Sequence, residues 1–371
     1  MTSASSHGGG SYRVYGMSQS YFTRKLTGYL DYKRIPYLFR RYVGMGGKPT
    51  EAGFPGGIPA VGTPAGEFMW DTTPLLHHLD ARSGEPSIFP ADSVQRFLAY
   101  LIEDASDEWI YRVAMGSRWC FVENHSVGGY ELGRDLAAHT SLTVDQAYEL
   151  VGAHVRSTLA PLGITPENAP RWMNEVLRPW QRSLGAHLES RSFVFGERAS
   201  LADFALFGGC AAHFANDPLC RRWLEADAPA LVRHTHRLFE PEELALGAWE
   251  DWSEARGEAA ASRVPETMVA LLRELGRTYL PWVSRACVDG AAEATFSDGS
   301  RVSIAASAFL RAARGVLHAR YVALRDERLD ALLARAGVLH YFAEFTAYAS
   351  AVPDPRVPPR PSENRPFAPA N

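Results

Sequence analysis

An Ile–Pro pair between two glycines and a short apolar run most constrains how this chain folds. Residues 56–61 read as a strand that follows a turn, and in the Ile58–Pro59 bond a cis peptide costs little. A cis peptide there turns the N–H and C=O of Ile58 outward, where an extended peptide can pair with them like an added strand. Further on, Asp71–Thr72 opens a helix whose hydroxyl and N–H groups suit a carboxylate. These segments predict a strand–strand–helix unit that binds a peptide-like ligand carrying a carboxylate.

Five stretches, in order along the chain, carry a resemblance to a known family. Residues 12–15 predict an opening strand, residues 20–26 a loop that runs into a helix, and residues 33–37 the exit into a second strand. Residues 71–79 form the helix described above, and residues 200–203 read as a capping box. In this order and at these separations the stretches resemble the cytosolic glutathione transferases, in particular bacterial members of the serine type with a C-terminal extension.

The resemblance implies a thioredoxin-like α/β domain over residues 12–84, which binds glutathione. It also implies an all-helical glutathione-transferase domain over residues 92–240, which carries the pocket for the second substrate. Residues 241–350 lie beyond the usual end of such a protein, and we expect there an extension of helices and one β-hairpin. Residues 351–371 are rich in proline and predict a disordered tail.

Several predictions concern single segments of these domains. Residues 94–105 repeat apolar side chains at helical spacing, and the resemblance gives this helix the subunit contact of a homodimer. Residues 123–140 are rich in histidine, glycine and charge and predict an irregular connection. In the extension, Asp298–Gly299 predict the turn of the hairpin, and residues 306–339 predict one long helical stretch.

Composition excludes several other classes of function. The 371 residues carry a net charge of −4 without a long basic run, so nucleic acid is not an expected partner. No apolar stretch approaches the length of a membrane span, and residues 1–10 lack the apolar core of a signal peptide, so no membrane partner is expected. Four scattered cysteines fit a reducing cytoplasm. His77–His78 and His234–His236 lack carboxylate or cysteine partners at ligand spacing, so no metal is expected.

Glutathione chemistry needs a thiolate at neutral pH, and a donor at a helix N-terminus lowers a thiol pKa from about 8.5. Counted back from residues 33–35, Ser20 stands where serine-type relatives keep the activating hydroxyl, so we expect it to donate to the glutathione sulfur. The alternative is that Ser20 only caps the helix. Ser18 in the same loop and Tyr15 at the strand end are alternative donors, although strand alternation favours a core position for Tyr15.

The rest of the expected glutathione site follows from the resemblance. The backbone of Ile58, just before Pro59, would pair with the cysteinyl unit of glutathione. Asp71 would face the ammonium of the γ-glutamyl end, and Thr72 would hold its carboxylate. The family more often has Glu-Ser here, so the Asp-Thr pair keeps the chemistry with a shorter reach. The remaining candidates line the site or meet the glycyl carboxylate: Tyr21, Thr23, Arg24 and Lys48.

Two functions stay open at this level. The leading one is a glutathione transferase-like enzyme, which activates the glutathione thiol for attack on a small hydrophobic electrophile by conjugation or glutathione-dependent isomerisation. The other is a non-catalytic binding module that keeps the fold and has lost the chemistry. The Asp-Thr pair and the extension favour this second function. Four tryptophans either line a co-substrate pocket or pack in the core: Trp109, Trp119, Trp172 and Trp180.

Overall fold

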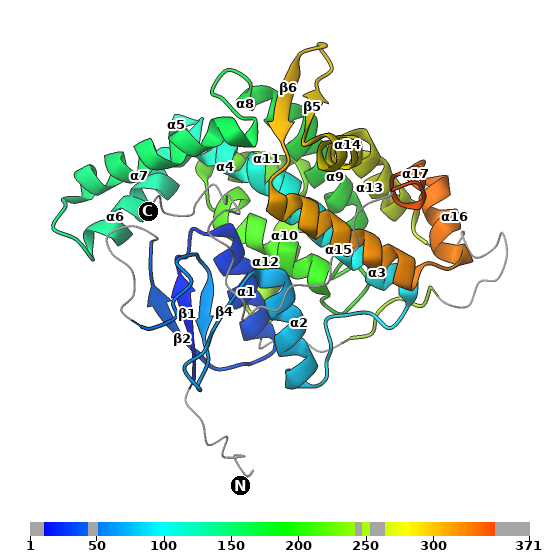
Figure 1. Ribbon diagram of the computed structural model, residues 1–371, viewed down its shortest axis with the longest axis horizontal. Helices are drawn as coiled ribbons and strands as arrows, with labels where there is room; N and C mark the ends of the chain where they lie inside the picture. The colour runs from blue at the N-terminus through cyan, green and yellow to red at the C-terminus, as the bar shows by residue number, and fades with distance from the viewer. Residues whose placement is uncertain (1–10, 44–50, 242–246, 253–263, 346–371) are drawn as a thin grey trace, which may run out of the picture.

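The computed structural model describes residues 11–43, 51–241, 247–252 and 264–345 of the chain. Within these ranges a small sheet with two helices forms one corner of the molecule, and helices make up most of the rest (Figure 1). Lys48 and the proline-rich residues 351–371 lie outside the described residues, so the predictions made for them stay predictions.

The sheet and its helices have the connectivity of a thioredoxin-like unit. They follow one another as β1 (Tyr12–Gly16), α1 (Tyr21–Tyr32), β2 (Tyr37–Arg41), β3 (Ala60–Gly62), β4 (Phe68–Trp70) and α2 (Thr72–Ser83). The strand order is β2-β1-β3-β4; β1 pairs parallel with β2, and β3 pairs antiparallel with β1 and β4. This small mixed sheet beside a mostly helical remainder fits the predicted thioredoxin-like domain with a helical second domain.

Side-chain alternation along β1 buries both faces of this sheet. Val14 points into the main core, where it meets apolar side chains of α1 and α2. Tyr15 points to the opposite face and joins a second, smaller cluster with Ala60 and Phe68. The prediction that Tyr15 is buried and that Val14 faces the other side is therefore confirmed.

The helical part runs through residues 93–239. Its helices, 3-10 turns and π-helical turns are α3 (Ser93–Ala105), η1 (Ser106–Ile110), α4 (Tyr111–Trp119), α5 (Val122–Asn124), η2 (His125–Gly129), α6 (Tyr130–Ala137), α7 (Val144–Leu159), η3 (Ala160–Leu162), α8 (Ala169–Trp172), η4 (Met173–Leu177), α9 (Arg178–Leu188), α10 (Leu201–Gly209), η5 (Cys210–Phe214), α11 (Pro218–Asp227) and α12 (Pro229–Phe239).

The prediction of an irregular connection over residues 123–140 is wrong, because α5, η2 and α6 make this segment helical. Leu132 and Leu136 of α6 pack against the apolar side of α7. Gly133 faces Tyr148 so closely that a Cβ there would lie 2.7 Å from its backbone, so this glycine lets the two helices approach rather than breaking one of them.

The capping box at the start of α10 is present as predicted. The backbone N–H and the hydroxyl of Ser200 both donate to Asp203 Oδ2, at 2.8 Å and 2.7 Å. The other carboxylate oxygen accepts the N–H of Val194 at 2.8 Å and lies 2.9 Å from His234 Nε2. His234 therefore serves this buried network rather than a metal.

The C-terminal part adds α13 (Glu266–Arg277), α14 (Tyr279–Asp289), β5 (Ala291–Thr295), β6 (Arg301–Ala305), α15 (Ala308–Leu324), α16 (Glu327–Arg335) and α17 (His340–Ala343). Strands β5 and β6 pair antiparallel, and Gly299 in the connecting turn has φ +80°. The single long helix predicted over residues 306–339 is wrong. Arg325 is extended with ψ 134°, and Asp326 then caps α16 by accepting the N–H of Leu329 at 2.9 Å.

This C-terminal part packs onto α3, the first long helix of the helical part (Figure 1). Helix α15 lies along α3, and most side chains of α3, polar ones included, are buried within the chain. Asp104, for example, accepts a 2.6 Å hydrogen bond from the hydroxyl of Tyr279 in α14. The main hydrophobic cluster accordingly runs without interruption from β1 to Phe345.

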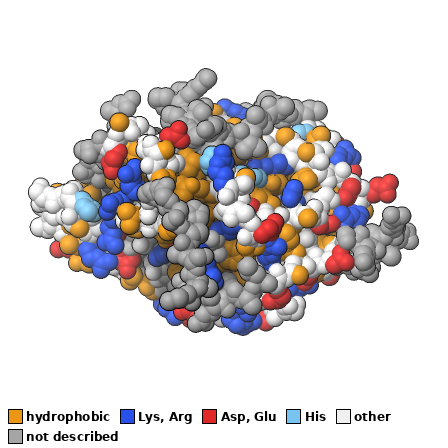
Figure 2. All heavy atoms as spheres, turned by 90° about the horizontal axis from the view of Figure 1, so that it is seen from below, with side chains coloured by type: hydrophobic (Ala, Val, Ile, Leu, Met, Phe, Trp, Pro, Cys, Tyr) orange, Lys and Arg blue, Asp and Glu red, His pale blue; other side chains and the backbone are white. Residues whose placement is uncertain are grey.

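Charges of both signs are interspersed over the face of the molecule seen in Figure 2. This mixture agrees with the small net charge of −4. Among the described residues, no helix is both long enough and apolar enough to cross a membrane.

Candidate functional site

Sheet register brings three of the predicted site segments to the same edge of the sheet. Tyr15 at the end of β1 pairs with Ala60 at the start of β3, and Ala60 pairs with Trp70 at the end of β4. The loop that leads to Ser20, the Ile58–Pro59 bond and the Asp71–Thr72 pair all adjoin these paired residues. Helices α1 and α2 both begin at this edge, so both positive ends of their dipoles are there.

Ser20 is the N-cap of α1 and has extended backbone angles, φ −88° and ψ 127°. Its Oγ accepts the N–H of Thr23 at 3.3 Å, which is the capping role expected of a serine at this position. A hydroxyl that accepts one bond still has a proton to donate, and no described residue accepts it. The structural role and a donor role toward a ligand are therefore compatible.

Side chains of the thioredoxin-like unit and of the helical part hold the loop before Ser20 in place. Arg24 Nε donates to the carbonyl of Ser18 at 2.8 Å, and Gln19 Nε2 donates to Glu131 of α6 at 3.0 Å. Arg118 of α4 donates to the carbonyl of Gln19 at 3.0 Å. The guanidinium of Arg24 is thus engaged with the loop itself.

The hydroxyl groups of Tyr15, Tyr21 and Thr23, which were also predicted for the site, are more enclosed by protein than that of Ser20. The Tyr15 hydroxyl donates to Glu51 at 2.5 Å, and burial, followed by the neighbouring Glu51, raises its pKa. Tyr21 is buried, and its hydroxyl donates to the carbonyl of Ser106 at 3.0 Å. Thr23 is buried against Gly16, where an added Cβ would lie 2.5 Å from its Oγ1.

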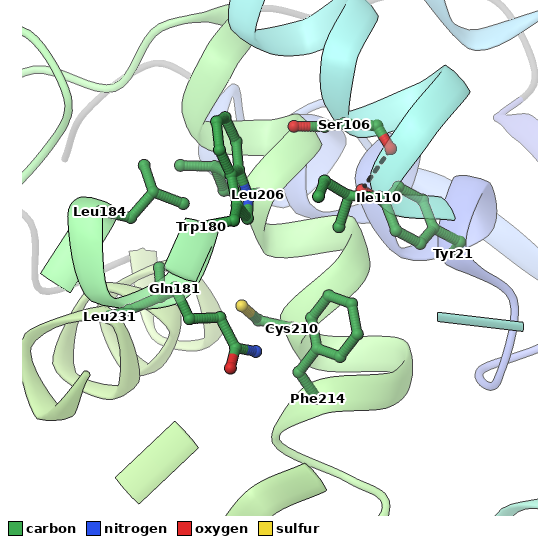
Figure 3. Close-up of a pocket in the computed structure, with 10 residues that line it drawn as sticks. All are labelled: Tyr21, Ser106, Ile110, Trp180, Gln181, Leu184, Leu206, Cys210, Phe214 and Leu231. Atoms are coloured by element: carbon green, nitrogen blue, oxygen red, sulfur yellow. Dashed lines mark hydrogen bonds between the residues drawn. The ribbon is translucent and has the colours of Figure 1, made fainter. Parts of the chain in front are cut away.

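A small cavity of about 10 Å³ adjoins Tyr21 (Figure 3). The carboxamide of Gln181 points toward it in Figure 3, and neither amide atom has a protein partner in the described part of the chain. A volume of this size holds about one water molecule, which would satisfy such an amide. This cavity is therefore suited to a structural water and not to a substrate.

The peptide bond between Ile58 and Pro59 is cis, as predicted from the sequence. Ile58 is half-buried and packs against the cluster around Tyr15. No described residue hydrogen-bonds its backbone N–H or C=O.

Asp71 has φ +64° and ψ 112°, a conformation that residues with a side chain rarely adopt. It precedes α2 as the N-cap, but its side chain does not cap the helix. Thr72, the first residue of α2, is buried with 4% exposure. Strained backbone of this kind persists where the surroundings enforce it and is often found at ligand sites.

Carboxylates of α3 and η1 lie near the start of α2, a placement that the sequence did not predict. Lys25 of α1 donates to Glu103 at 2.6 Å and to Asp107 at 2.5 Å. Thr73 also donates to Glu103. The negative charge of Asp71 acts on Asp107, which places this cluster beside the Asp71–Thr72 pair.

Burial sets the protonation of two of these acids. It raises the pKa of Glu108 to about 8 against the opposing effect of Arg112, with Asp104, Asp107 and Asp71 adding to the rise. It also raises the pKa of Asp107 to about 7, against Lys25. The acidic residues within 103–108 are the sequence signal for this carboxylate cluster. The same pattern is equally typical of the solvent-facing side of an amphipathic helix.

His77 and the four tryptophans singled out in the sequence are packed within the protein. His77 stacks on Phe89 at 4.1 Å, and burial lowers its pKa to about 3. No group of metal-binding side chains occurs within the described ranges. The four tryptophans, Trp109, Trp119, Trp172 and Trp180, are all at most 3% exposed.

No protein-family model matches this chain, and no curated protein matches it either. Solved structures do match. A beta-etherase from Sphingobium sp. strain SYK-6 aligns at 15% identity over 64% of this chain and 100% of its own, with a TM-score of 0.47. A glutathione S-transferase from Methylobacterium radiotolerans, in complex with glutathione sulfonate, aligns at 17% identity over 67% and 100%, with a TM-score of 0.39. FzlA from C. crescentus aligns at 16% identity over 64% and 97%, with a TM-score of 0.38.

Proposed function

We propose that this chain is a glutathione transferase-like enzyme that binds glutathione at the sheet edge and activates its thiol. The observation that carries the proposal is the meeting of Ser20, Ile58 and Asp71 at one edge, where two helices begin. Donors and helix N-termini together favour a thiolate and a carboxylate.

Each part of glutathione would have its own partner in this site. The Ser20 hydroxyl donates to the sulfur, with Ser18 and Tyr15 as the alternative donors. The backbone of Ile58, before Pro59, pairs with the cysteinyl unit. Asp71 meets the γ-glutamyl ammonium, and Thr72 meets the γ-glutamyl carboxylate.

An apolar co-substrate would lie beside the Ser20 loop, against aromatic side chains of the thioredoxin-like unit and of the helical part. Phe22 of α1 and Tyr111 of α4 are partly buried, with their rings 4.9 Å apart. A small hydrophobic electrophile placed there is within reach of the thiolate, by conjugation or glutathione-dependent isomerisation. Tyr21, Thr23, Arg24 and Lys48 are proposed only as supporting residues of this region.

A non-catalytic binding module is the second candidate. Its support is the ordinary capping bond of Ser20 to Thr23 N–H, which accounts for that serine without any chemistry. In this case glutathione or a related peptide binds, but its thiol keeps its usual pKa.

The proposed enzyme acts in the cytoplasm, without a metal, and the family resemblance implies a homodimer. Because α15 and other C-terminal segments pack on α3, we propose that a homodimer of this chain uses a surface other than α3. We retain the helix–hairpin–helix extension as a unit of the proposed enzyme, with no catalytic role assigned to it.

Calorimetric titration of glutathione, together with thiolate absorbance near 240 nm against pH, tests the function. We expect binding at millimolar glutathione or below and a thiol pKa at least one unit under its free value of about 8.5. Ser20→Ala should bring the pKa back toward that value, while Ser18→Ala, the matched control in the same loop, should not. Binding without a depressed pKa would select the non-catalytic module, and no binding would refute both.

A further inference from the structure

Arg320 of α15 connects the C-terminal part to two other helices of the molecule, α2 and α3. Helix α15 lies along α3 (Figure 1), and the guanidinium carbon of Arg320 is 3.9 Å from the centre of the Tyr100 ring of α3. This distance is that of a cation–π contact. Nη2 of Arg320 lies 3.1 Å from Nε2 of His77 in α2. Because an arginine side chain has only donors, the His77 nitrogen is the acceptor.

His77 is suited to accept this bond because its ring is neutral and held in place. Burial, followed by the charge of Arg320, lowers the pKa of His77 to about 3. The ring stacks on Phe89 at 4.1 Å and on Tyr100 at 5.5 Å. His77 follows Thr73 by four residues, so it lies one helical turn from the start of α2. Arg320 therefore holds the first part of α2 against α3.

The positive charge of Arg320 also acts on Glu103, the carboxylate that contacts the first turn of α2. Glu103 is 3% exposed and accepts hydrogen bonds from Lys25 and from the hydroxyl of Thr73. Burial opposes its ionisation, but the charges of Lys25 and then of Arg320 hold the pKa of Glu103 below its usual value. Tyr100 precedes Glu103 by three residues, so both side chains lie on the side of α3 that Arg320 contacts.

The ionised Glu103 opposes the binding of another carboxylate at the start of α2. Its partner Thr73 directly follows Thr72, the residue proposed to hold the γ-glutamyl carboxylate of glutathione. Two negative charges in a partly buried region repel each other unless cations offset them. Lys25 offsets part of the charge of Glu103, and Arg320 is a second cation that does so.

We propose that Arg320 of the extension is a positioning residue for the γ-glutamyl end of the glutathione site. Its bond to His77 holds α2 in place, and its charge offsets that of Glu103, so that the first turn of α2 accepts a carboxylate. This inference rests on the proposed function. Helix α15 thus contributes to the site from the α3 surface that the family resemblance gives to a subunit contact, and it does so within one chain.

Calorimetric titration of two ligands into the full-length protein tests this role. One is glutathione, and the other is γ-aminobutyryl-cysteinyl-glycine, which lacks only the γ-glutamyl carboxylate. We expect Arg320→Met to weaken glutathione about five- to tenfold, the effect of one charge-assisted contact, and to leave the affinity for the second peptide unchanged. Arg320→Lys keeps the charge and should recover part of the lost glutathione affinity. Arg311→Met is the matched control, because Arg311 is also a partly buried arginine of α15 but donates to the carbonyl of Ala306 at 2.8 Å, within the extension.

The ratio of the two affinities within one variant separates positioning from a loss of folded protein, because both ligands meet the same folded fraction. Equal weakening of the two peptides by Arg320→Met would make Arg320 a structural residue only and overturn the proposal. Unchanged glutathione affinity in Arg320→Met, or no recovery in Arg320→Lys, would also overturn it, while glutathione binding by the wild type would still support the proposed function. A wild-type protein that binds no glutathione would refute the proposed function and this inference together.

Discussion

Arg118 and Asp217 form a buried ion pair that joins helix α4 to the start of α11. Arg118 Nη2 lies 2.9 Å from Asp217 Oδ1, and Nε lies 3.0 Å from Oδ2, with both side chains at most 1% exposed. The remaining nitrogen of Arg118 donates to the carbonyl of Gln19 at 3.0 Å. This pair therefore connects the helical part to the loop that carries Ser20.

We predict that Arg118→Met destabilises the protein by about 3 to 5 kcal/mol, because it leaves the Asp217 carboxylate buried and unpaired. The double variant Arg118→Met/Asp217→Leu removes both charges and should recover much of that loss. Urea unfolding, followed by circular dichroism, measures the free energy of unfolding of the single and the double variant. If the double variant is as unstable as the single one, the unpaired charge is not the cause.

The same pair should influence the proposed glutathione site through the Gln19 carbonyl. Arg118→Lys keeps the charge but cannot reach Asp217 and Gln19 in the same fork geometry. We expect it to weaken glutathione binding by about tenfold, since one hydrogen bond to a charged group contributes about 1.5 kcal/mol. Calorimetry below the unfolding midpoint checks this, and unchanged affinity would show that the loop holds Ser20 without Arg118.

Close packing of α1 on α10 predicts a strong effect at Gly28. A Cβ added there would lie 2.5 Å from the Phe207 ring, so Gly28→Ala should destabilise by about 1 to 3 kcal/mol through overpacking. Gly152→Ala in α7 is the matched control. The atoms nearest to its added Cβ belong to the flexible end of Arg156, and the gain in helix propensity should stabilise by roughly 0.5 to 1 kcal/mol. Equal shifts of the urea midpoint in the two variants would contradict the packing argument.

Stability should fall between pH 6.5 and pH 8. Glu108, with its pKa raised to about 8, stays protonated in the folded chain and is ionised when unfolded, so folding loses free energy as pH rises to that value. The pKa of Asp107 is raised to about 7, so its ionisation lowers the stability in the same pH range. The pKa of His77 is lowered to about 3, so the titration of His77 changes the stability in the opposite direction. That change is complete above pH 6.5. We expect a loss on the order of 1 to 2 kcal/mol per group.

Glu108→Gln tests this pH dependence directly. The variant should flatten the decline in unfolding free energy measured by urea titration at pH 6.5, 7.25 and 8. Glu149→Gln, at a 72% exposed carboxylate in α7, is the control and should leave the decline in place. A Glu108→Gln profile parallel to that of the wild type would show that another group titrates.

The C-terminal part should be inseparable from the rest of the protein. Because α15 packs along α3, a chain that ends at residue 252 exposes apolar side chains of α3 such as Phe97, which contacts Tyr321 at a ring distance of 5.7 Å. We expect this truncated chain to aggregate or to bind a hydrophobic dye strongly. A truncated chain that stays monomeric with an unchanged melting temperature would show that the extension is an independent unit.

Elements with local signals were predictable from the sequence. The strand at Tyr12–Gly16, the Ser20 and Ser200 caps and the cis peptide at Pro59 each depend on a few adjacent residues. The hydrogen bonds and allowed dihedral angles that fix such elements are set by neighbours in the chain. The same reasoning failed over residues 123–140, because a glycine-rich helix is stabilised there by packing against α7.

Local motifs along the chain ordered the segments, and the family resemblance that they carry named Ser20, Ile58 and Asp71 as a candidate site. Their meeting at one edge came from the register of β1, β3 and β4, which pairs residues far apart in sequence. The burial of Glu103 and its pairing with Lys25 likewise depend on distant segments, since Lys25 lies in α1 and the extension closes over α3. Hydrophobic periodicity marks an apolar side of a helix, but only packing determines whether the polar side meets water or another part of the chain.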